Sequence, residues 1–288
     1  MPALETAADD YLIKLSVRGL VEFVLQEGDL GGLFQAGDRA LAGTRGHQQV
    51  QKSRPADYQA EVPISHQVEA RGIRLEISGR IDGLYPAEQP PVLEEIKTTA
   101  RGIAFIEADY NPLHWAQAKC YAYIYAHQHG LAEICLQLTY FQIDTHETKS
   151  FRETFPLADL ATFFHHLLDA YLDWAQAIKT WQETRNASIT ALTFPHPTYR
   201  PGQRDMAVAV YRTIHQRAKL FAQAPTGIGK TIAVLFPTIK AIGTGLISKI
   251  FYLTAKTPGR LVAEKAIDDL RAGGLSLKTI TLTAKDKL

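Results

Sequence analysis

Three ionisable side chains lie close together in the stretch GRIDGLYPAEQPPVLEEIKTT, residues 79–99. Asp82 ends one apolar run, and Glu95 and Lys97 lie in the next run, beyond a proline-containing turn. Side chains on a strand alternate between its two faces, so Glu95 and Lys97 share a face and stand about 6.6 Å apart along the strand. Two carboxylates can hold a divalent cation while an ammonium group positions water or phosphate. The chemistry that this set favours is metal-assisted hydrolysis of a phosphodiester.

The acid–x–lysine spacing alone has a plainer interpretation, which is a solvated strand face. Glu147 and Lys149 show the same spacing, but no second acid is expected on a neighbouring strand, and we assign them no chemistry. The alternation of apolar residues upstream also places Asp82 on the polar face of its strand. A β-bulge or a sharp twist at one of the flanking glycines would be needed to turn Asp82 toward Glu95.

The next expected element is a helix over residues 112–129, because Asn and Pro precede it and Gly follows it. His114, Gln117 and Tyr121 are spaced to share one face of this helix. Three motifs now stand in order, namely Gly79-x-x-Asp82, Glu95-x-Lys97 and Gln117-x-x-x-Tyr121. In this order they resemble the PD-(D/E)XK nucleases of the RecB type, over roughly residues 10–190. His47 fits the place where that family has a histidine on an upstream helix.

The resemblance implies a divalent metal site for Mg²⁺ or Mn²⁺. On that basis Asp82 and Glu95 are metal ligands, the carbonyl of Ile96 adds an oxygen, and His47 completes the shell. The fold that it implies is a mixed sheet flanked by helices. The substrate class that it implies is DNA.

The remaining roles also follow from the resemblance. Lys97 stabilises the nucleophile or the charge that develops on phosphorus, and Gln117 and Tyr121 orient Lys97 and the DNA backbone. Ile81 stands where the family's name has proline. Some relatives carry an iron–sulfur cluster, but Cys120 and Cys135 are the two cysteines of this chain, so we expect no cluster within it.

A second motif with chemical meaning is AQAPTGIGKT, residues 222–231, between the apolar segments LFA and TIAVLF. Its spacing matches a phosphate-binding loop between a strand and a helix, with Ala224 at the position usually held by the first glycine. Lys230 would contact the β- and γ-phosphates of a nucleotide, and Thr231 would hold Mg²⁺. A glycine-rich turn without function is the alternative. The expected phosphate contacts are Ala224, Pro225, Thr226, Gly227, Ile228, Gly229, Lys230 and Thr231.

The segment around this loop resembles superfamily 2 helicases of the XPD/DinG type. YRPGQRDM resembles their adenine-reading segment, so Arg200 and Gln203 would contact the base of ATP. FYLTAKTPGR, residues 251–260, resembles the next helicase motif, a strand followed by a loop that touches DNA. The later acidic motif, the second lobe and four iron–sulfur cysteines of such motors do not occur here, so we expect a front part of a longer protein.

Charge and element order divide the chain into two expected domains, residues 1–195 and 196–288. The first 195 residues hold 16 Lys or Arg against 25 Asp or Glu, and the remainder holds 15 against 5. In the first domain we expect a helix over 11–25, a loop then a helix ending near 51, three strands (61–69, 73–85, 92–99), the helix over 112–129, two strands (133–143, 148–155) and a long helix from 160 to 181. Beyond 195 we expect the start of a RecA-like domain of alternating helices and strands, with strands at 220–222 and 251–254.

The whole chain therefore predicts an α/β protein, a RecB-like nuclease fused to the start of an ATP-dependent DNA helicase. No apolar run is long enough to span a membrane and no signal peptide is visible, so we expect a cytoplasmic DNA-processing or repair enzyme. Two rival interpretations remain. The nuclease-like domain could bind DNA without cutting it, or both sites could be inert parts of a scaffold.

Overall fold

The computed structural model describes residues 4–7, 10–27 and 36–282, with side chains described within 11–27 and 43–282. It divides into two compact units, Met1–Gln176 and Ala177–Leu288. The division falls inside one long helix, α4 (Leu157–Ala191), whereas the sequence places the boundary after residue 195.

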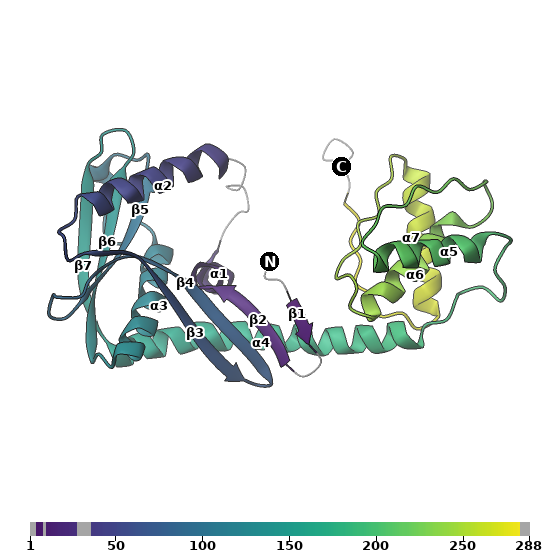
Figure 1. The fold of residues 1–288 in the computed structure, drawn as a ribbon, viewed down its shortest axis with the longest axis horizontal. Coiled ribbons are helices and arrows are strands. Elements are labelled where there is room, and N and C mark those ends of the chain that lie inside the picture. The colour runs from purple at the N-terminus through teal and green to yellow at the C-terminus, as the bar shows by residue number, and fades with distance from the viewer. Residues whose placement is uncertain (1–3, 8–9, 28–35, 283–288) are drawn as a thin grey trace. The chain divides into compact units, whose positions relative to one another are not determined.

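The first unit is built on a seven-stranded mixed sheet (Figure 1). Its strand order is β1-β2-β4-β5-β6-β7, and β3 pairs with β4 off this path. The pairs β2–β4 and β5–β6 are parallel, and the other pairs are antiparallel. The strands are β1 (Leu4–Ala7), β2 (Asp10–Ser16), β3 (Gln59–Ala70), β4 (Ile73–Tyr85), β5 (Val92–Thr99), β6 (Glu133–Gln142) and β7 (Thr148–Pro156).

Helices cover both faces of this sheet (Figure 1). On one face, a large apolar core joins the strands to α1 (Val17–Leu25), α3 (Pro112–His129) and the first half of α4. On the other face, α2 (Ala36–Lys52) packs through a small cluster of Val50, Ile96 and Phe141. Strand alternation therefore sends successive β5 side chains to different helices, Ile96 toward α2 and its neighbours toward α3.

Most expected elements of this unit are confirmed. The three strands over 61–99, the two strands after residue 132 and the long amphipathic helix are present. The helix over 112–129 begins where the Asn111 side chain accepts a hydrogen bond from the Leu113 amide at 3.0 Å. It ends at Gly130, whose φ of 64° is left-handed. These elements combine to give the expected mixed sheet flanked by helices.

The expected helix over residues 11–25 is wrong in its first half. Residues 10–16 form β2, which pairs in parallel with β4, and α1 begins at Val17. Ile13, Leu15 and Val17 are buried on every second residue, which is strand periodicity. The Ser16 hydroxyl caps α1 by accepting from the Gly19 amide at 2.9 Å. The three-residue spacing of Leu12 and Leu15, which Val17 and Leu20 repeat, extended the apparent helix across this cap.

The second unit contains α5 (Gln203–His215), α6 (Lys230–Gly243) and α7 (Thr257–Ala272), packed with the end of α4. The strands expected at 220–222 and 251–254 are wrong, since neither segment is a strand among the described residues. Phe221, Phe251 and Leu253 are 95%, 82% and 89% exposed. A parallel strand is stable when neighbours pair with it and helices cover it, and the described part of this unit supplies no partner strand.

Within the described residues, every helix falls short of the length and apolar character that a membrane span requires.

Candidate functional site

The candidate site of the first unit lies in a fork between β4 and β5. The two strands pair over three residue pairs, from Tyr85↔Val92 to Gly83↔Glu94. Beyond Gly83 the Asp82 carboxylate takes the place of a backbone partner, because Oδ2 accepts the Ile96 amide hydrogen at 2.7 Å. Asp82 is thus brought to β5 by divergence of the strands. The sheet is also distorted here: Glu61, which lies opposite Asp82 on β3, is missing from the β3–β4 ladder and has a left-handed φ of 56°.

On the α3 side of the fork, Glu95 and Lys97 form a close pair. Glu95 is 1% exposed, and its Oε1 lies 2.6 Å from Lys97 Nζ. Lys97 also donates to Gln117 Oε1 on α3 at 3.0 Å. The second carboxylate oxygen, Glu95 Oε2, is buried and has no hydrogen-bond partner among the described residues. A buried carboxylate oxygen in this state is destabilising unless a proton, a water or a cation meets it.

Tyr121 lies one turn beyond Gln117 and fills the space that Gly79 leaves. A Cβ at residue 79 would stand 2.6 Å from the Tyr121 hydroxyl, so a side chain there would displace the phenol. Burial, followed by the negative charge of Glu95, raises the pKa of Tyr121 to about 12. The phenol therefore stays protonated near neutral pH and can donate a hydrogen bond.

On the α2 side, His47 and Gln51 are one helical turn apart and both reach Asp82. His47 Nδ1 lies 3.3 Å from Asp82 Oδ1, and Gln51 Nε2 donates to the Asp82 carbonyl at 2.9 Å. Burial by itself lowers the pKa of His47, but the hydrogen bond and charge of Asp82, with Glu95 behind it, raise that pKa overall. The structure thus gathers the predicted His47, Asp82, Glu95, Lys97, Gln117 and Tyr121 in one place.

The charges in the fork favour the binding of a cation. Burial raises the pKa of Glu95, Lys97 opposes this shift, and Asp82 adds to it. Among the described residues no group of three or more His, Cys, Asp or Glu side chains stands ready as a metal cluster. Two carboxylates with a nearby main-chain carbonyl still fit Mg²⁺, which prefers oxygen and keeps several of its waters. The unpartnered Glu95 Oε2 is the observation that supports this fit.

Three further residues show what spacing alone can and cannot find. Glu94 is adjacent to Glu95 but points to the α2 face and is fully buried. His114 donates or accepts at 2.9 Å with the Tyr140 hydroxyl, and burial, followed by Lys97, lowers its pKa to about 3. Lys149, from the second acid–x–lysine pair, donates instead to the Ile106 carbonyl at 2.6 Å. The partners of all three come from distant parts of the chain.

The loop 224–231 of the second unit, which the sequence predicts to bind phosphate, is held by Arg200 and by the first residue of α5, Gln203. Gln203 is 2% exposed, accepts from the Arg200 amide at 3.0 Å and donates to the Gly229 carbonyl at 3.3 Å. Arg200 donates to the Gly227 carbonyl. The two residues predicted to read a nucleotide base are therefore in contact with the loop predicted to hold its phosphates.

Within the loop, Lys230 begins α6 and turns back on its own backbone. Its Nζ donates to the carbonyls of Ala224 at 2.9 Å and Pro225 at 3.2 Å. Gly227 and Gly229 have φ of 88° and 80°, a left-handed conformation that glycine adopts without strain. Thr231 is half-buried in the first turn of the helix. A helix N-terminus behind such a loop is a suitable place for an anion.

Comparisons with known proteins give a limited result. No family model matches the chain. A stretch of 46 residues is 39% identical to a probable ATP-dependent helicase of Methanocaldococcus jannaschii. It covers 16% of this chain and 7% of that relative, so the chain spans a small part of the relative's length. The solved structure titled "Crystal structure of SSO0001" aligns over 59% of this chain and 78% of that one, with 17% identity and a TM-score of 0.40. Part of the chain is thus similar to a helicase.

Proposed function

We propose that the first unit is a metal-dependent DNA nuclease. The observation that carries this proposal is Glu95 Oε2, a buried carboxylate oxygen without a partner, beside Asp82 and Lys97. A purely structural carboxylate at 1% exposure would be expected to have both oxygens satisfied. A divalent cation bound by Asp82 and Glu95 would give this oxygen the partner that it lacks.

In this proposal Asp82, Glu95 and the Ile96 carbonyl hold Mg²⁺ or Mn²⁺, with His47 at the edge of the shell. When bound, the ion supplies Lewis-acid polarisation of the phosphate and lowers the pKa of water. Lys97, fixed by Gln117, aligns the attacking water and neutralises charge that develops on the phosphate oxygens. The water oxygen then forms a bond to phosphorus as the bond to the leaving oxygen breaks. The proton that the water loses passes to solvent, and the leaving oxygen takes up a proton from solvent.

The protonated Tyr121 hydroxyl has a supporting role in the same proposal. It lies on the α3 face one turn from Gln117, with its pKa raised to about 12. Buried behind Gln117 and hydrogen-bonded with it, Tyr121 orients Gln117 and, through it, Lys97 and the bound DNA backbone. DNA rather than RNA is the substrate that we favour, because the nuclease resemblance is to enzymes that act on DNA.

A second activity is proposed for the second unit, which is binding of ATP by the loop 224–231 with Mg²⁺ at Thr231. The contacts of Arg200 and Gln203 with the loop support it. Part of the chain is similar to a probable ATP-dependent helicase. Together the two units would belong to a DNA-processing or repair enzyme that couples cleavage to an ATP-dependent motor.

The nuclease proposal is tested by incubating the full chain with end-labelled single- and double-stranded DNA in Mg²⁺ or Mn²⁺. The variant Glu95→Gln keeps the volume of the side chain and removes its charge, so we expect cleavage to disappear while the melting temperature stays close to that of the wild type. Glu147→Gln, in the second acid–x–lysine pair, is the matched control and should cut normally. Cleavage by a folded Glu95→Gln protein at the wild-type rate would refute the assignment. Binding without cleavage by the wild type would favour the DNA-binding alternative.

A further inference from the structure

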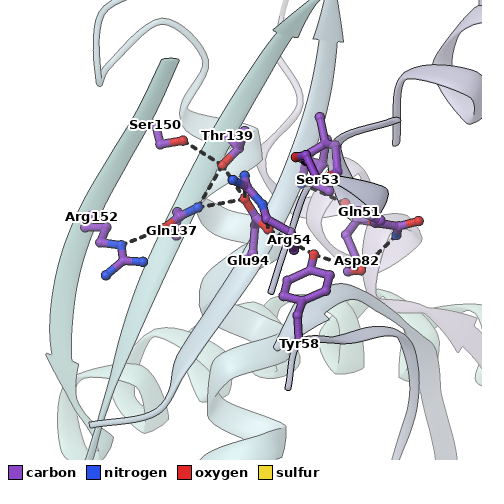
Figure 2. Close-up of polar contacts among 12 residues, drawn as sticks. Gln51, Ser53, Arg54, Tyr58, Asp82, Glu94, Gln137, Thr139, Ser150 and Arg152 are labelled. Carbon is purple, nitrogen blue, oxygen red and sulfur yellow. Dashed lines mark hydrogen bonds and ion pairs between the residues drawn. The ribbon is translucent and has the colours of Figure 1, made fainter. Parts of the chain in front are cut away.

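Glu94 lies next to Glu95 in the sequence but has the opposite environment. It is 0% exposed, and both of its carboxylate oxygens are satisfied (Figure 2). Oε2 accepts from Tyr58 Oη at 2.9 Å and from Arg54 Nε at 3.2 Å. Oε1 accepts from Gln137 Nε2 at 2.7 Å, from Thr139 Oγ1 at 2.5 Å and from the second Arg54 nitrogen. Because both oxygens already accept hydrogen bonds, Glu94 has a structural role and is not a metal ligand.

The donors to Glu94 come from two separate places. Gln137 and Thr139 lie on β6, the neighbouring strand, whereas Arg54 and Tyr58 lie in the connection between α2 and β3. This connection starts with a turn, in which the Ser53 hydroxyl donates to the Val50 carbonyl at 2.6 Å (Figure 2). Glu94 therefore ties the C-terminal end of α2 to the middle of the sheet.

The same end of α2 and the turn after it contact Asp82. The Asp82 carbonyl accepts from Gln51 at 2.9 Å, and the Tyr58 hydroxyl lies 3.5 Å from it (Figure 2). Tyr58 can approach because residue 83 is glycine, where a Cβ would stand 1.6 Å from the phenol oxygen. One turn before Gln51, His47 contacts the Asp82 carboxylate. The helix and its following turn thus contact the backbone and the side chain of Asp82 together.

Within the described side chains of α2, residues 43–52, the apolar packing is limited to one small cluster. That cluster contains Val50, Ile96 and Phe141. The polar contacts of Arg54 and Tyr58 must therefore supply much of the restraint on the C-terminal end of α2. Loss of the Glu94 charge would leave Arg54 partly buried without its counter-charge, which favours withdrawal of the connection toward water.

We propose that Glu94 is a positioning residue of the metal site. It fixes the C-terminal end of α2 by bonding Arg54 and Tyr58 in the connection that follows the helix, and α2 in turn places His47 against Asp82. The inference rests on the proposed function, because it assumes that Asp82 and Glu95 bind a divalent cation. Groups that hold metal ligands in place commonly change metal affinity by about 10- to 100-fold. Glu94 differs from such groups in acting from the opposite face of the strand.

The test measures Mn²⁺ affinity by calorimetry on the full chain without DNA. We expect Glu94→Gln to weaken Mn²⁺ binding about tenfold, on the scale of other ligand-supporting residues. His47→Ala alone should also weaken Mn²⁺ binding. The double variant should bind Mn²⁺ as tightly as His47→Ala does, because both substitutions act on the same contact, that of His47 with Asp82. The control is Glu88→Gln, which breaks only the exposed ion pair with Arg152 at the outer end of the network and should bind as the wild type does.

The outcomes separate this inference from the proposed function. Wild-type protein that takes up no Mn²⁺ removes the proposed metal site and the inference with it. Wild-type binding with an unchanged, folded Glu94→Gln variant overturns the inference alone. Losses that multiply in the double variant also overturn it, because Glu94 would then not act through His47. If Glu94→Gln does not fold, Tyr58→Phe carries the test, because it keeps the ring and removes the hydroxyl that bonds Glu94. Mn²⁺ binding should then weaken, and binding at the wild-type affinity would overturn the inference.

Discussion

The fork of the first unit and the phosphate loop of the second hold their lysines in different ways. Lys97 lies on a strand of a complete sheet, paired with Glu95 and fixed by Gln117 from a helix. Lys230 turns back on the carbonyls of its own loop, and apolar segments near it are exposed. The side chains of a site built on paired strands are in place before a ligand binds. Lys230, by contrast, must break its hydrogen bonds to the loop carbonyls before it can bind phosphate.

The largest effect that would sharpen this contrast is expected from Lys97→Ala. Cleavage should fall by roughly 100- to 1000-fold, the scale for losing one group that stabilises transition-state charge. Mn²⁺ binding should persist, because Lys97 is not a ligand. Single-turnover cleavage and calorimetry on the same variant measure the two quantities. Lys149→Ala is the matched lysine, and equal loss of cleavage in both variants would contradict the role of Lys97.

The packing around the fork can be disrupted by a substitution at Gly79. A methyl group there would meet the Tyr121 hydroxyl at 2.6 Å, so Gly79→Ala should destabilise the unit by about 1–3 kcal/mol, as overpacking usually does. Adding Tyr121→Leu, which removes the hydroxyl and the ring carbon that the methyl would meet at 2.6 and 2.7 Å, should recover part of that loss. Urea denaturation measures both. Gly43→Ala, where the new methyl meets Thr98 at an ordinary 3.6 Å, is the control and should not destabilise.

The burial of His114 near the fork should make the free energy of unfolding depend on pH. The pKa of His114 is lowered to about 3 by burial and by Lys97, while the unfolded chain titrates near the ordinary histidine value of about 6.5. Between these values the unfolded state binds more protons, so stability falls as pH falls below about 6.5. Between about pH 7 and pH 5 the loss is up to about 2 kcal/mol. His114→Gln should flatten this slope, and the exposed His166→Gln should not. An unchanged slope in His114→Gln would contradict the burial of a neutral imidazole.

The smallest effect is expected from the loop. Lys230→Ala should weaken ATP binding about tenfold, because one charge-assisted hydrogen bond contributes about 1.5 kcal/mol or more. Equilibrium dialysis with labelled ATP measures it. The melting temperature should hardly change, since the contacts of Lys230 are exposed. Lys265→Ala, on the surface of α7, is the control, and equal affinity in both variants would contradict the assignment.

The two regions also differ in how much of them the sequence predicted. Glu95–Lys97 and Gln117–Tyr121 could be placed on shared faces, because strand and helix periods are local properties. The direction of Asp82 could not, since it depends on where β4 and β5 stop pairing. The role of Glu94 depends on Arg54, which is 40 residues away and has no fixed spacing from it. The strands expected at 220–222 and 251–254 failed for a related reason, because apolar sequence supplies strand propensity but not a pairing partner.

The central claim, that the fork binds a divalent cation, is tested most directly by anomalous diffraction from crystals of the full chain soaked in Mn²⁺. We predict one strong anomalous peak between the carboxylates of Asp82 and Glu95, on the side of Glu95 Oε2, and no such peak in crystals of Glu95→Gln. An empty fork in wild-type crystals soaked at millimolar Mn²⁺, or a peak that persists in Glu95→Gln, would contradict the account.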